Sequence, residues 1–342
     1  MNKEKLAGKT LSELTEIAVL LDLPRYTGKQ MASWLYAKRV NSIDDMTNLS
    51  KQARNKLSER YIVGWSSPSA EALSSDGTAK YLFAVGDGHK YIESVYIPDR
   101  ERATLCVSSQ IGCKMNCYFC MTGKQGFSGN LSAAEIINQI VSIPNSYSLT
   151  NLVFMGMGEP ADNVEEVLKA VEILTSAWGF GWSPKRITIS SVGLRKGLDR
   201  LLDECSCHIA ISLHTPYHAE RESLMPIEKA NPLLEVISLL KQYDFSGQRR
   251  ISFEYIVFKG LNDSLAHAKE LVRILAGIPC RVNLIRFHAI PGVDLQTSDL
   301  QAMERFRDYL STHRITCTIR TSRGEDILAA CGMLSTLKNK RE

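Results

Sequence analysis

The spacing of apolar residues changes character near residue 100. From Leu11 to about Tyr61, apolar side chains recur every three or four residues, as they do along one face of a helix. The runs LSELTEIAVLL, KQMASWLYAKR and DMTNLSKQARNKLSERY are therefore expected to be helices, with Ser and Asp where helix starts are favoured. The next piece, KYLFAVGDGHKYIESVYIPD, alternates apolar and polar residues on both sides of Gly-Asp-Gly, which predicts a β-hairpin.

Beyond about Ala103, strand-like runs alternate with amphipathic helical runs. The expected strands are ATLCVSS, NLVFMGM, RITISSV, HIAISLH, ISFEYIVF, RVNLIRF and ITCTIRT. The expected helices are AAEIINQIVS, VEEVLKAVEILTSA, LRKGLDRLLDE, LLEVISLLKQY, LAHAKELVRILA and LQAMERFRDYLSTH.

Strand–helix alternation on this scale predicts parallel strands joined by right-handed crossovers. We expect an α/β fold whose core is a partial (βα)6 barrel similar to the TIM barrel. A full barrel or an open doubly wound sheet would give the same pattern. In a barrel, catalytic groups lie at the carboxyl ends of the strands, so motifs at those ends deserve most weight.

The chain divides into four expected segments: a helical part at 1–64, a strand-rich part at 65–98, a barrel core at 99–332 and a basic tail at 333–342. Residues 1–64 carry 11 Lys and Arg against 7 Asp and Glu, whereas the remainder carries 30 of each. A basic appendage on a neutral body suits a polyanionic partner such as RNA. A solvated Lys/Arg face is the commoner meaning of such an excess.

Cysteine usage and the absence of apolar spans indicate a compartment. No apolar run is long enough to cross a bilayer, and none follows the basic residues of MNKEKLAGKT, so we expect a cytoplasmic protein with no signal peptide and no membrane contact. The reducing cytosol disfavours structural disulfides, so some of the nine cysteines should serve metal or thiol chemistry. Four others lie in or beside apolar runs and are expected to be small core residues: Cys205, Cys207, Cys280 and Cys317.

Three cysteines are closely spaced directly after the first barrel strand. In GCKMNCYFCMTGKQGF, Cys113, Cys117 and Cys120 give the spacing C-x3-C-x2-C. Zinc usually takes four ligands, and no fourth Cys or His lies nearby in the sequence. Three thiolates on a four-iron cluster leave one iron open to a substrate. We therefore expect a [4Fe-4S] cluster here, against the alternative of chance clustering or core packing.

This spacing, with Phe119 before the last cysteine, resembles the radical S-adenosylmethionine superfamily. The resemblance implies that the open iron chelates S-adenosylmethionine and that its cleavage yields a 5′-deoxyadenosyl radical. The segment MGMGEP, which contains Gly156, resembles the superfamily's GGEP-like motif. It implies that Gly158 and Glu159 hold the amino end of the methionine moiety.

Polar residues at later strand ends are further cofactor candidates. Ser190 ends the third strand, Ser212, Leu213 and His214 end the fourth, and His288 ends the sixth. Each alone would more often be a satisfied polar residue at a barrel rim. Their shared position at strand ends favours contacts with S-adenosylmethionine.

Five longer strings narrow the resemblance to the RlmN/Cfr family of RNA adenine methyltransferases. They are RATLCVSSQIGC, FCMTGKQGF, MGMGEPADN, ISLHTP and TSRGEDILAACG. The resemblance implies that one S-adenosylmethionine methylates Cys331 and a second generates the radical, so that two are used per turnover. The methyl carbon then bonds to adenine, and Cys106 releases the product as a Cys106–Cys331 disulfide forms. It also implies that Glu93 accepts a proton, although the residues alone would place Glu93 on a solvent-facing strand.

Two departures from the family pattern are visible. The family commonly has Pro-Trp-Asn at the end of the sixth strand, whereas this chain has Arg286, Phe287 and His288. A backbone contact to S-adenosylmethionine would survive that change, but a side-chain amide contact would be altered. Lys114 and Met115 also differ, but neither is a ligand, so little consequence is expected.

The resemblance implies methylation of adenosine C2 in 23S ribosomal RNA and in tRNA, with residues 1–64 as an RNA-binding accessory domain. Methylation at C8 is the alternative within the family, and one sequence does not decide between the two carbons. An iron–sulfur RNA-binding protein without catalysis, and a radical enzyme for a small molecule, are alternatives from other classes. An electron donor such as flavodoxin or ferredoxin is expected, as is a monomeric state.

Overall fold

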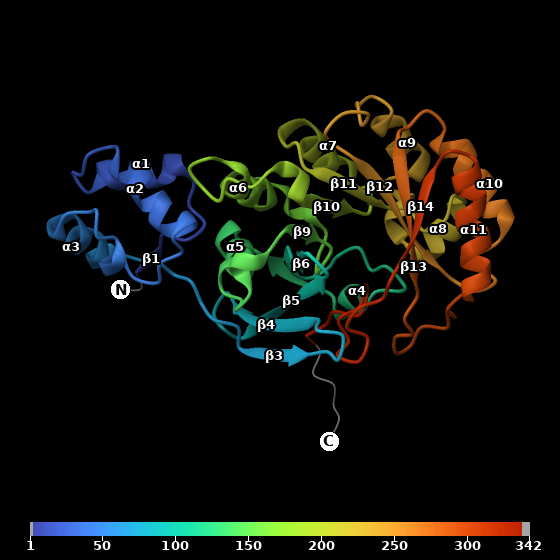
Figure 1. Ribbon diagram of the computed structural model, residues 1–342, viewed down its shortest axis with the longest axis horizontal. Helices are drawn as coiled ribbons and strands as arrows, with labels where there is room; N and C mark the ends of the chain where they lie inside the picture. Colours follow the sequence, from blue (N-terminus) through green and yellow to red (C-terminus); the bar gives the residue numbers. More distant parts are fainter. Residues whose placement is uncertain (1–2, 337–342) are drawn as a thin grey trace, which may run out of the picture.

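A ten-stranded sheet forms the body of the protein in the computed structural model, which describes residues 3–336 (Figure 1). Seven of its strands are parallel and follow one another in chain order: β6 (Arg102–Cys106), β9 (Asn151–Phe154), β10 (Ile187–Ser191), β11 (His208–Ser212), β12 (Ile251–Val257), β13 (Cys280–Arg286) and β14 (Thr316–Arg320). The seven strands expected from the sequence are confirmed.

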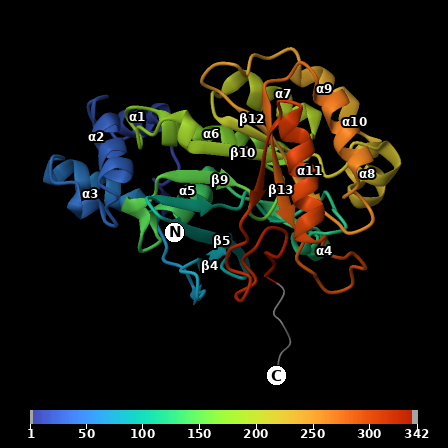
Figure 2. The same ribbon diagram turned by 45° about the vertical axis from the view of Figure 1, so that its right-hand side comes forward.

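Helices connect these strands on the outer side of the curved sheet (Figures 1 and 2). They are α5 (Ala133–Val141), α6 (Val164–Thr175), α7 (Arg195–Glu204), α8 (His218–Leu224), α9 (Leu233–Leu240), α10 (Leu265–Leu275) and α11 (Leu300–Thr312). The strand order never reverses, so right-handed crossovers place every connection on the same face. A doubly wound sheet, which reverses its order, is therefore excluded, and the expected partial barrel is confirmed.

Strands β9 and β10 alternate between buried and partly exposed side chains. In β10, Ile187 and Ile189 are fully buried toward the helices, whereas Thr188 and Ser190 on the other face are half-exposed. This alternation follows from the two-residue repeat of a strand. The open face forms the inside of the barrel, so polar side chains there remain available to a ligand.

Three antiparallel strands extend the same sheet beyond β6. They are β3 (Ala70–Leu73), β4 (Ala79–Val85) and β5 (Lys90–Asp99), with β5 paired to β6. The turn between β4 and β5 contains Gly86 and Gly88, both with positive φ, as the predicted hairpin requires. The strand-rich segment is thus continuous with the barrel sheet.

The amino-terminal residues form a separate group of helices (Figure 1). Its elements are β1 (Glu4–Lys5), α1 (Leu11–Leu20), α2 (Thr27–Ala32), a π-helical turn η1 (Ser33–Ala37), a 3₁₀ turn η2 (Ile43–Asp45), α3 (Lys51–Arg60) and β2 (Tyr61–Ile62). The expected helix from Asp45 is too long at its start: α3 begins at Lys51, because the Ser50 hydroxyl accepts the Ala53 N–H at 3.1 Å and caps the helix there.

Contacts of two kinds fasten this helical group to the core. Lys169 of α6 forms a 2.7 Å ion pair with Glu13 of α1. The fully buried Tyr36 ring packs against Trp178 and Phe180 at 6.0 Å between ring centroids. Aromatic packing of this kind holds the appendage in one position on the barrel.

The chain after β14 has no helix or strand within the described residues. It crosses the open end of the barrel and lies beside α4 (Met121–Gln125) and the β3–β4 turn (Figure 1). Of the basic tail expected at 333–342, residues 337–342 lie outside the described part. Within residues 3–336, no helix has both the length and the apolar character needed to span a bilayer.

A substitution of Gly197 tests how closely α7 packs against the loop after β9. A Cβ at this position would lie 1.8 Å from the Ala161 carbonyl oxygen, so Gly197→Ala forces the two elements apart. We expect the variant to lose at least about 2 kcal/mol of unfolding free energy, despite the higher helix propensity of alanine. Chemical denaturation measures the loss. Gly247→Ala, which meets open space, should change stability by less than about 0.5 kcal/mol.

Candidate functional site

The three clustered cysteines lie on a loop between β7 (Gln110–Gly112) and α4. Gly112 starts this loop with φ +76°, and a Cβ there would lie 1.6 Å from the Gly126 carbonyl oxygen, so only glycine fits. The same carbonyl accepts the Cys113 N–H at 3.1 Å, and the Cys117 carbonyl accepts the Cys120 N–H at 3.1 Å. These backbone contacts fold the loop so that all three thiols lie in one region.

The thiols interact with one another through space. Burial, and then repulsion from the neighbouring thiols, raises the pKa of Cys117 well above its ordinary value, and burial raises that of Cys113 to about 12. None of the three is in a disulfide. Cys117 belongs to an apolar cluster, against which Cys120 packs, with Phe119, Val192, Leu224, Met225, Ile256, Phe258 and Phe287.

This donor set fits an iron–sulfur cluster. Three soft thiol donors are grouped in apolar surroundings, and a bound cationic centre would deprotonate them and remove their mutual repulsion. Within residues 3–336, no three His, Cys, Asp or Glu side chains converge closely enough to hold a single metal ion. A four-iron cluster suits a wider spacing, because each iron takes one cysteine.

Glu159 lies beside this loop, after β9, and is almost fully buried. Its carboxylate accepts the Ala161 N–H at 3.0 Å and the Val192 N–H at 2.9 Å, so it joins the ends of β9 and β10. Burial raises its pKa to about 7. Gly158 before it has φ +100°, and a Cβ there would lie 2.5 Å from the Gln110 side chain, so a substitution would displace the carboxylate.

The residues expected to contact the cofactor on the next strands lie on one rim but differ in exposure to solvent. Ser212 is the last residue of β11, as expected, whereas Ser190 is the last but one of β10, which ends at Ser191. Both side chains are half-buried on the inner face. Leu213 is fully buried, and both of its backbone groups are engaged, its N–H by the Glu254 carbonyl at 3.0 Å and its carbonyl by Arg221 at 3.1 Å.

His214 is a buried, neutral histidine at this rim. Its backbone is left-handed, with φ +60°. Burial, with the nearby Arg221, lowers its pKa to about 3. Its Nδ1 accepts the Ile256 N–H at 3.0 Å, which leaves the proton on Nε2. The His214 ring lies edge-on to the ring of Phe119, with 4.8 Å between centroids. Phe119 is the residue directly before Cys120 in the chain.

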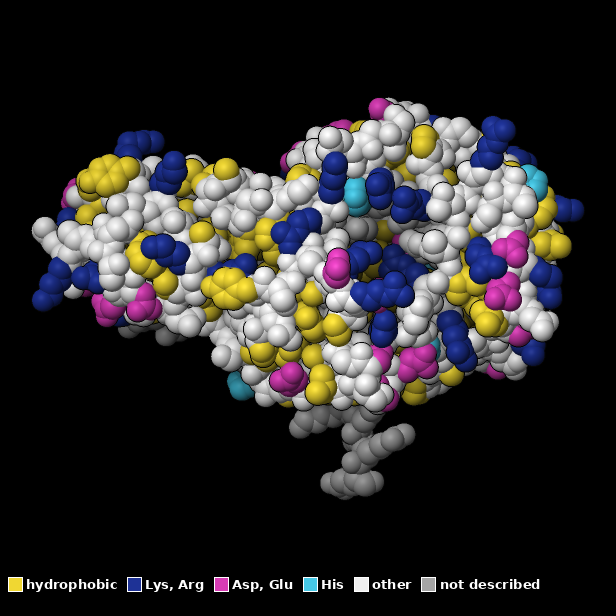
Figure 3. Space-filling view, in the orientation of Figure 1, with side chains coloured by type: hydrophobic (Ala, Val, Ile, Leu, Met, Phe, Trp, Pro, Cys, Tyr) yellow, Lys and Arg dark blue, Asp and Glu magenta, His cyan; other side chains and the backbone are white. Residues whose placement is uncertain are grey.

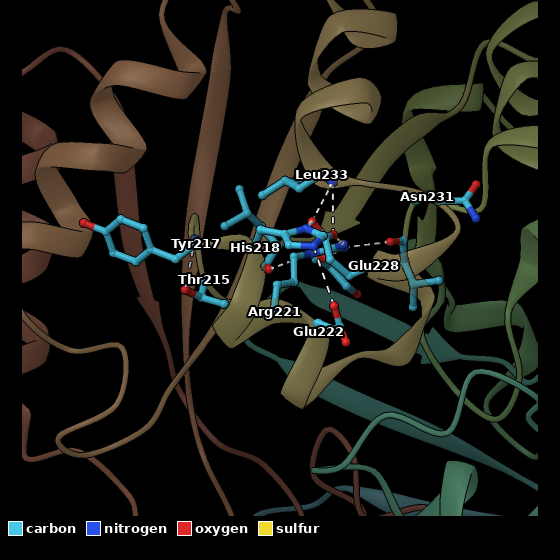
Figure 4. Close-up of polar contacts among 12 residues, drawn as sticks. Thr215, Tyr217, His218, Arg221, Glu222, Glu228, Asn231 and Leu233 are labelled. Carbon is cyan, nitrogen blue, oxygen red and sulfur yellow. Dashed lines mark hydrogen bonds and ion pairs between the residues drawn. The ribbon is translucent and has the colours of Figure 1, made fainter.

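Arg221 of α8 fastens the rim from behind. Its side chain is completely buried and donates to the carbonyls of Val192 at 2.8 Å, Ser212 at 2.9 Å and Leu213 at 3.1 Å. It also pairs with Glu228, whose carboxylate accepts the Leu233 N–H and contacts His218 (Figure 4). One guanidinium therefore holds the ends of β10 and β11 together. No feature of the string HAERESLMPIE predicted this role of Arg221.

Cys106 ends β6, and Glu93 lies on the neighbouring strand β5, two residues before Val95, which pairs with Cys106. Burial, and then the Cys331 thiol, raises the pKa of Cys106 to about 12. Glu93 is buried and not solvent-facing, which corrects the placement that the residues alone suggested. It forms a 3.0 Å ion pair with Lys80 and accepts the Ser335 N–H at 3.0 Å, while burial raises its pKa.

The carboxyl-terminal segment, residues 321–336, carries Cys331 to this place. The Gly332 carbonyl accepts the Met121 N–H at 2.8 Å, and the Leu334 carbonyl accepts the Thr122 hydroxyl at 2.7 Å. Cys331 is accessible to solvent, yet the surrounding protein raises its pKa, and Arg320, Glu254 and Cys120 are close enough to act on it. The segment thus places the Cys331 thiol within electrostatic range of both Cys106 and Cys120.

Other contacts hold the first half of this segment. Asp326 accepts the Ser74 hydroxyl at 2.6 Å and the Ser75 N–H at 3.1 Å, next to the β3–β4 turn. His288, which follows β13, lies 3.0 Å from the Ser322 hydroxyl through Nε2 and 3.7 Å from Glu325. His288 therefore contacts the segment itself in this structure, in addition to lying at the expected strand end.

A hollow with Lys and Arg side chains in and around it opens on the face drawn in Figure 3, in the region that Figure 1 shows between β6 and β14. At the amino ends of the strands, Lys185, Arg250 and Arg281 surround His208, whose Nδ1 accepts the Arg250 N–H at 3.0 Å. In the described chain, none of these three cations has a carboxylate within ion-pair distance. They form an exposed positive edge at the amino ends of β10, β12 and β13.

The Arg221 contacts generate a stability prediction. Arg221→Met leaves Glu228 and three carbonyls buried without their donor, so unfolding free energy should fall by about 3–5 kcal/mol. Arg221→Lys keeps the charge but not the planar fork, and should lose an intermediate amount. Denaturation of the metal-free protein measures both. A loss below about 1 kcal/mol for Arg221→Met would contradict the fastening role.

Known proteins share both parts of this structure. The family model described as the radical SAM superfamily matches residues 107–272, and that described as the ribosomal RNA large subunit methyltransferase N-terminal domain matches residues 5–63. The chain is 63% identical over 340 residues to a probable dual-specificity RNA methyltransferase RlmN of Phocaeicola vulgatus, covering 99% of this chain and 97% of that protein. It is 39% identical to the dual-specificity RNA methyltransferase RlmN of Syntrophus aciditrophicus, covering 98% and 97%.

A solved structure agrees with these relatives. The crystal structure of a radical SAM methyltransferase from Sphaerobacter thermophilus superposes with a TM-score of 0.90 at 38% identity, covering 97% of this chain and 99% of that one. The fold, the cysteine loop and near full-length similarity lead to one conclusion: the chain belongs to the RlmN family of the radical SAM superfamily.

Proposed function

We propose that this protein methylates C2 of adenosine in 23S ribosomal RNA and in tRNA. The observation that carries the proposal is the docking of residues 321–336 on α4, which brings Cys331 into electrostatic range of Cys106 and Cys120. Relatives at 39–63% identity over nearly their whole length are named as dual-specificity RNA methyltransferases. Methylation at C8 is the alternative, and it differs only in the ring carbon that receives the methyl group.

Cys113, Cys117 and Cys120 would hold a [4Fe-4S] cluster, and Gly158, Glu159, Ser190, Ser212, Leu213, His214 and His288 would contact S-adenosylmethionine. When bound, this pair of cofactors supplies the methyl group and a 5′-deoxyadenosyl radical, with two S-adenosylmethionine molecules used per turnover. A contact in this stretch is best made by the half-buried Ser212, since the backbone groups of Leu213 are already paired. The neutral His214 can donate from Nε2 without adding a charge to the site.

Cys331 is the methyl carrier in this proposal, and its exposure to solvent suits that task. After its methyl carbon has bonded to the adenine ring, protein and RNA are joined through the Cys331 sulfur. Cys106 as thiolate attacks that sulfur, and the electron pair of the breaking sulfur–carbon bond passes to the carbon, which takes up a proton and becomes the methyl group, while a Cys106–Cys331 disulfide is left. Two thiols are thereby oxidised, and both must be reduced before the next turnover.

Glu93 is the proposed proton acceptor. Burial raises its pKa, which makes the carboxylate a better base than an exposed glutamate, while Lys80 at 3.0 Å acts in the opposite direction and favours the charged form. The Ser335 N–H fixes one carboxylate oxygen at 3.0 Å, so the base belongs to the same assembly as the Cys331 segment.

The RNA partner is supported by charge. Residues 1–64 carry the chain's excess of basic residues, and Lys185, Arg250 and Arg281 form a positive edge at the amino ends of the strands. Such cations attract phosphates by a salt-dependent interaction. We further propose that residues 1–64 act as an RNA-binding accessory domain, that 65–98 link it to the core at 99–332, and that the protein is a cytoplasmic monomer reduced by a flavodoxin or ferredoxin.

Cys331→Ala tests this proposal. In anaerobically reconstituted protein, we expect no methylated RNA, because the methyl carrier is gone, whereas cluster absorption and cleavage of S-adenosylmethionine remain. Mass spectrometry of digested RNA measures the product. Cys280→Ala, at the distant amino end of β13, is the matched control and should keep its activity. Full methylation by Cys331→Ala would sink the two-cysteine mechanism, and absence of methylation by the wild type would favour a non-catalytic RNA-binding protein.

A further inference from the structure

Glu254 is a buried carboxylate on the inner face of β12. One of its oxygens, Oε1, accepts the Ser252 hydroxyl at 3.0 Å and an Asn283 amide N–H at 2.8 Å. The Thr318 hydroxyl donates to the Asn283 carbonyl oxygen at 2.8 Å, which fixes the orientation of that amide. Three neighbouring strands therefore hold the Glu254 side chain in one position.

The second oxygen of Glu254, Oε2, has no hydrogen-bond partner within residues 3–336 although it is buried. The whole side chain is only 5% exposed. Buried acceptors are nearly always paired in folded proteins, and a carboxylate oxygen is the most demanding of them. The inner face of β12 therefore holds one fixed acceptor oxygen that the N–H or O–H group of a ligand would pair.

Arg320 of β14 lies beside this carboxylate with unused donors. Its guanidinium is 3.5 Å from Oε1 of Glu254, too long for a strong hydrogen bond, and its side chain is 38% exposed. Both groups also act on the pKa of the Cys331 thiol, Arg320 lowering it and Glu254 raising it. An acceptor and a donor thus stand next to each other near the methyl carrier.

A neighbouring acceptor and donor complement one edge of adenine. The exocyclic amine of adenine donates, and the ring nitrogen beside it accepts. Guanine presents a carbonyl oxygen where adenine has its amine, and that oxygen would repel a carboxylate. We propose that Glu254 Oε2 accepts the amine of the target adenine while Arg320 donates to its N1, so that this pair selects adenine in the RNA.

The choice of N1 rests on the proposed function. C2 is bonded to N1, so a base held through its amine and N1 presents C2 on the side of Arg320 and Cys331. A base held through its amine and N7 would present C8 instead. A hydrogen bond to N1 also withdraws electron density from C2, which favours attack by an electron-rich carbon centre.

Synthetic RNA hairpins that differ at one nucleotide test the inference. The target adenosine is replaced by purine ribonucleoside, which lacks the amine, by 1-deazaadenosine or by 7-deazaadenosine. For the wild type we expect kcat/KM to fall about 10- to 100-fold without the amine or without N1, and by less than about threefold without N7. Equal use of adenosine and purine ribonucleoside would overturn the inference.

Glu254→Gln is the matching protein variant. Oε1 accepts two donors, so the amide oxygen will occupy that side and an NH2 group will replace Oε2. We expect lower activity on adenosine and a preference over purine ribonucleoside of no more than about twofold. Thr316→Ala, on the same inner face at the start of β14, is the control and should keep the wild-type preference.

S-adenosylmethionine also contains adenine, so its dissociation constant is measured in parallel. A constant within about twofold of wild type in Glu254→Gln, together with lost selectivity, supports recognition of the RNA base. Weaker S-adenosylmethionine binding with retained selectivity assigns the oxygen to the cofactor and overturns the inference. If the wild type methylates no hairpin, the proposed function fails, and the affinities of the adenosine and purine hairpins still decide whether Glu254 reads the amine.

Discussion

Every functional feature of this structure depends on the fact that all crossovers of the parallel sheet run in one direction. Seven strands then bring their carboxyl ends to one rim and leave their inner faces to a common hollow. The helices take up the apolar side chains on the outer face. Polar residues from strands far apart in the sequence can therefore meet inside the barrel.

Buried charges maintain the rim against the tendency of strand ends to separate. Glu159 joins the ends of β9 and β10 by accepting two backbone N–H groups, and Arg221 joins β10 and β11 by donating to three carbonyls. Each of these groups would be costly if it stood alone in the interior, but each is matched with backbone or with a counter-ion. The cysteine loop lies against this fastened rim, so the expected cluster ligands and cofactor contacts share one rigid support.

The sequence alone predicted the parts of the site that depend on short-range spacing. Cys113, Cys117 and Cys120 are separated by fixed intervals, and the strand–helix alternation extends over more than two hundred residues. Helix limits were less certain, since Ser50 rather than Asp45 determines where α3 begins. Burial of Glu93 was missed because its ion pair with Lys80 needs the β4–β5 register.

Longer-range relations were beyond the sequence for a physical reason. The contact of Ser335 with Glu93 spans 242 residues, and that of Arg320 with Glu254 joins β14 to β12 across an intervening strand. No local pattern encodes such pairs, because they exist only once the barrel has closed around the hollow. Resemblance to a family supplied Cys106, Cys331 and Glu93 as candidates, whereas Arg221, Glu254 and Arg320 came from the structure.

The most direct measurement of the central claim is the position of the methyl group that the wild-type protein adds. Anaerobically reconstituted protein is incubated with S-adenosylmethionine, a reductant and unmodified 23S ribosomal RNA or tRNA, and the digested nucleosides are identified by mass spectrometry against standards. We expect 2-methyladenosine from both RNAs. Formation of 8-methyladenosine, or of no methylated adenosine, would contradict the claim.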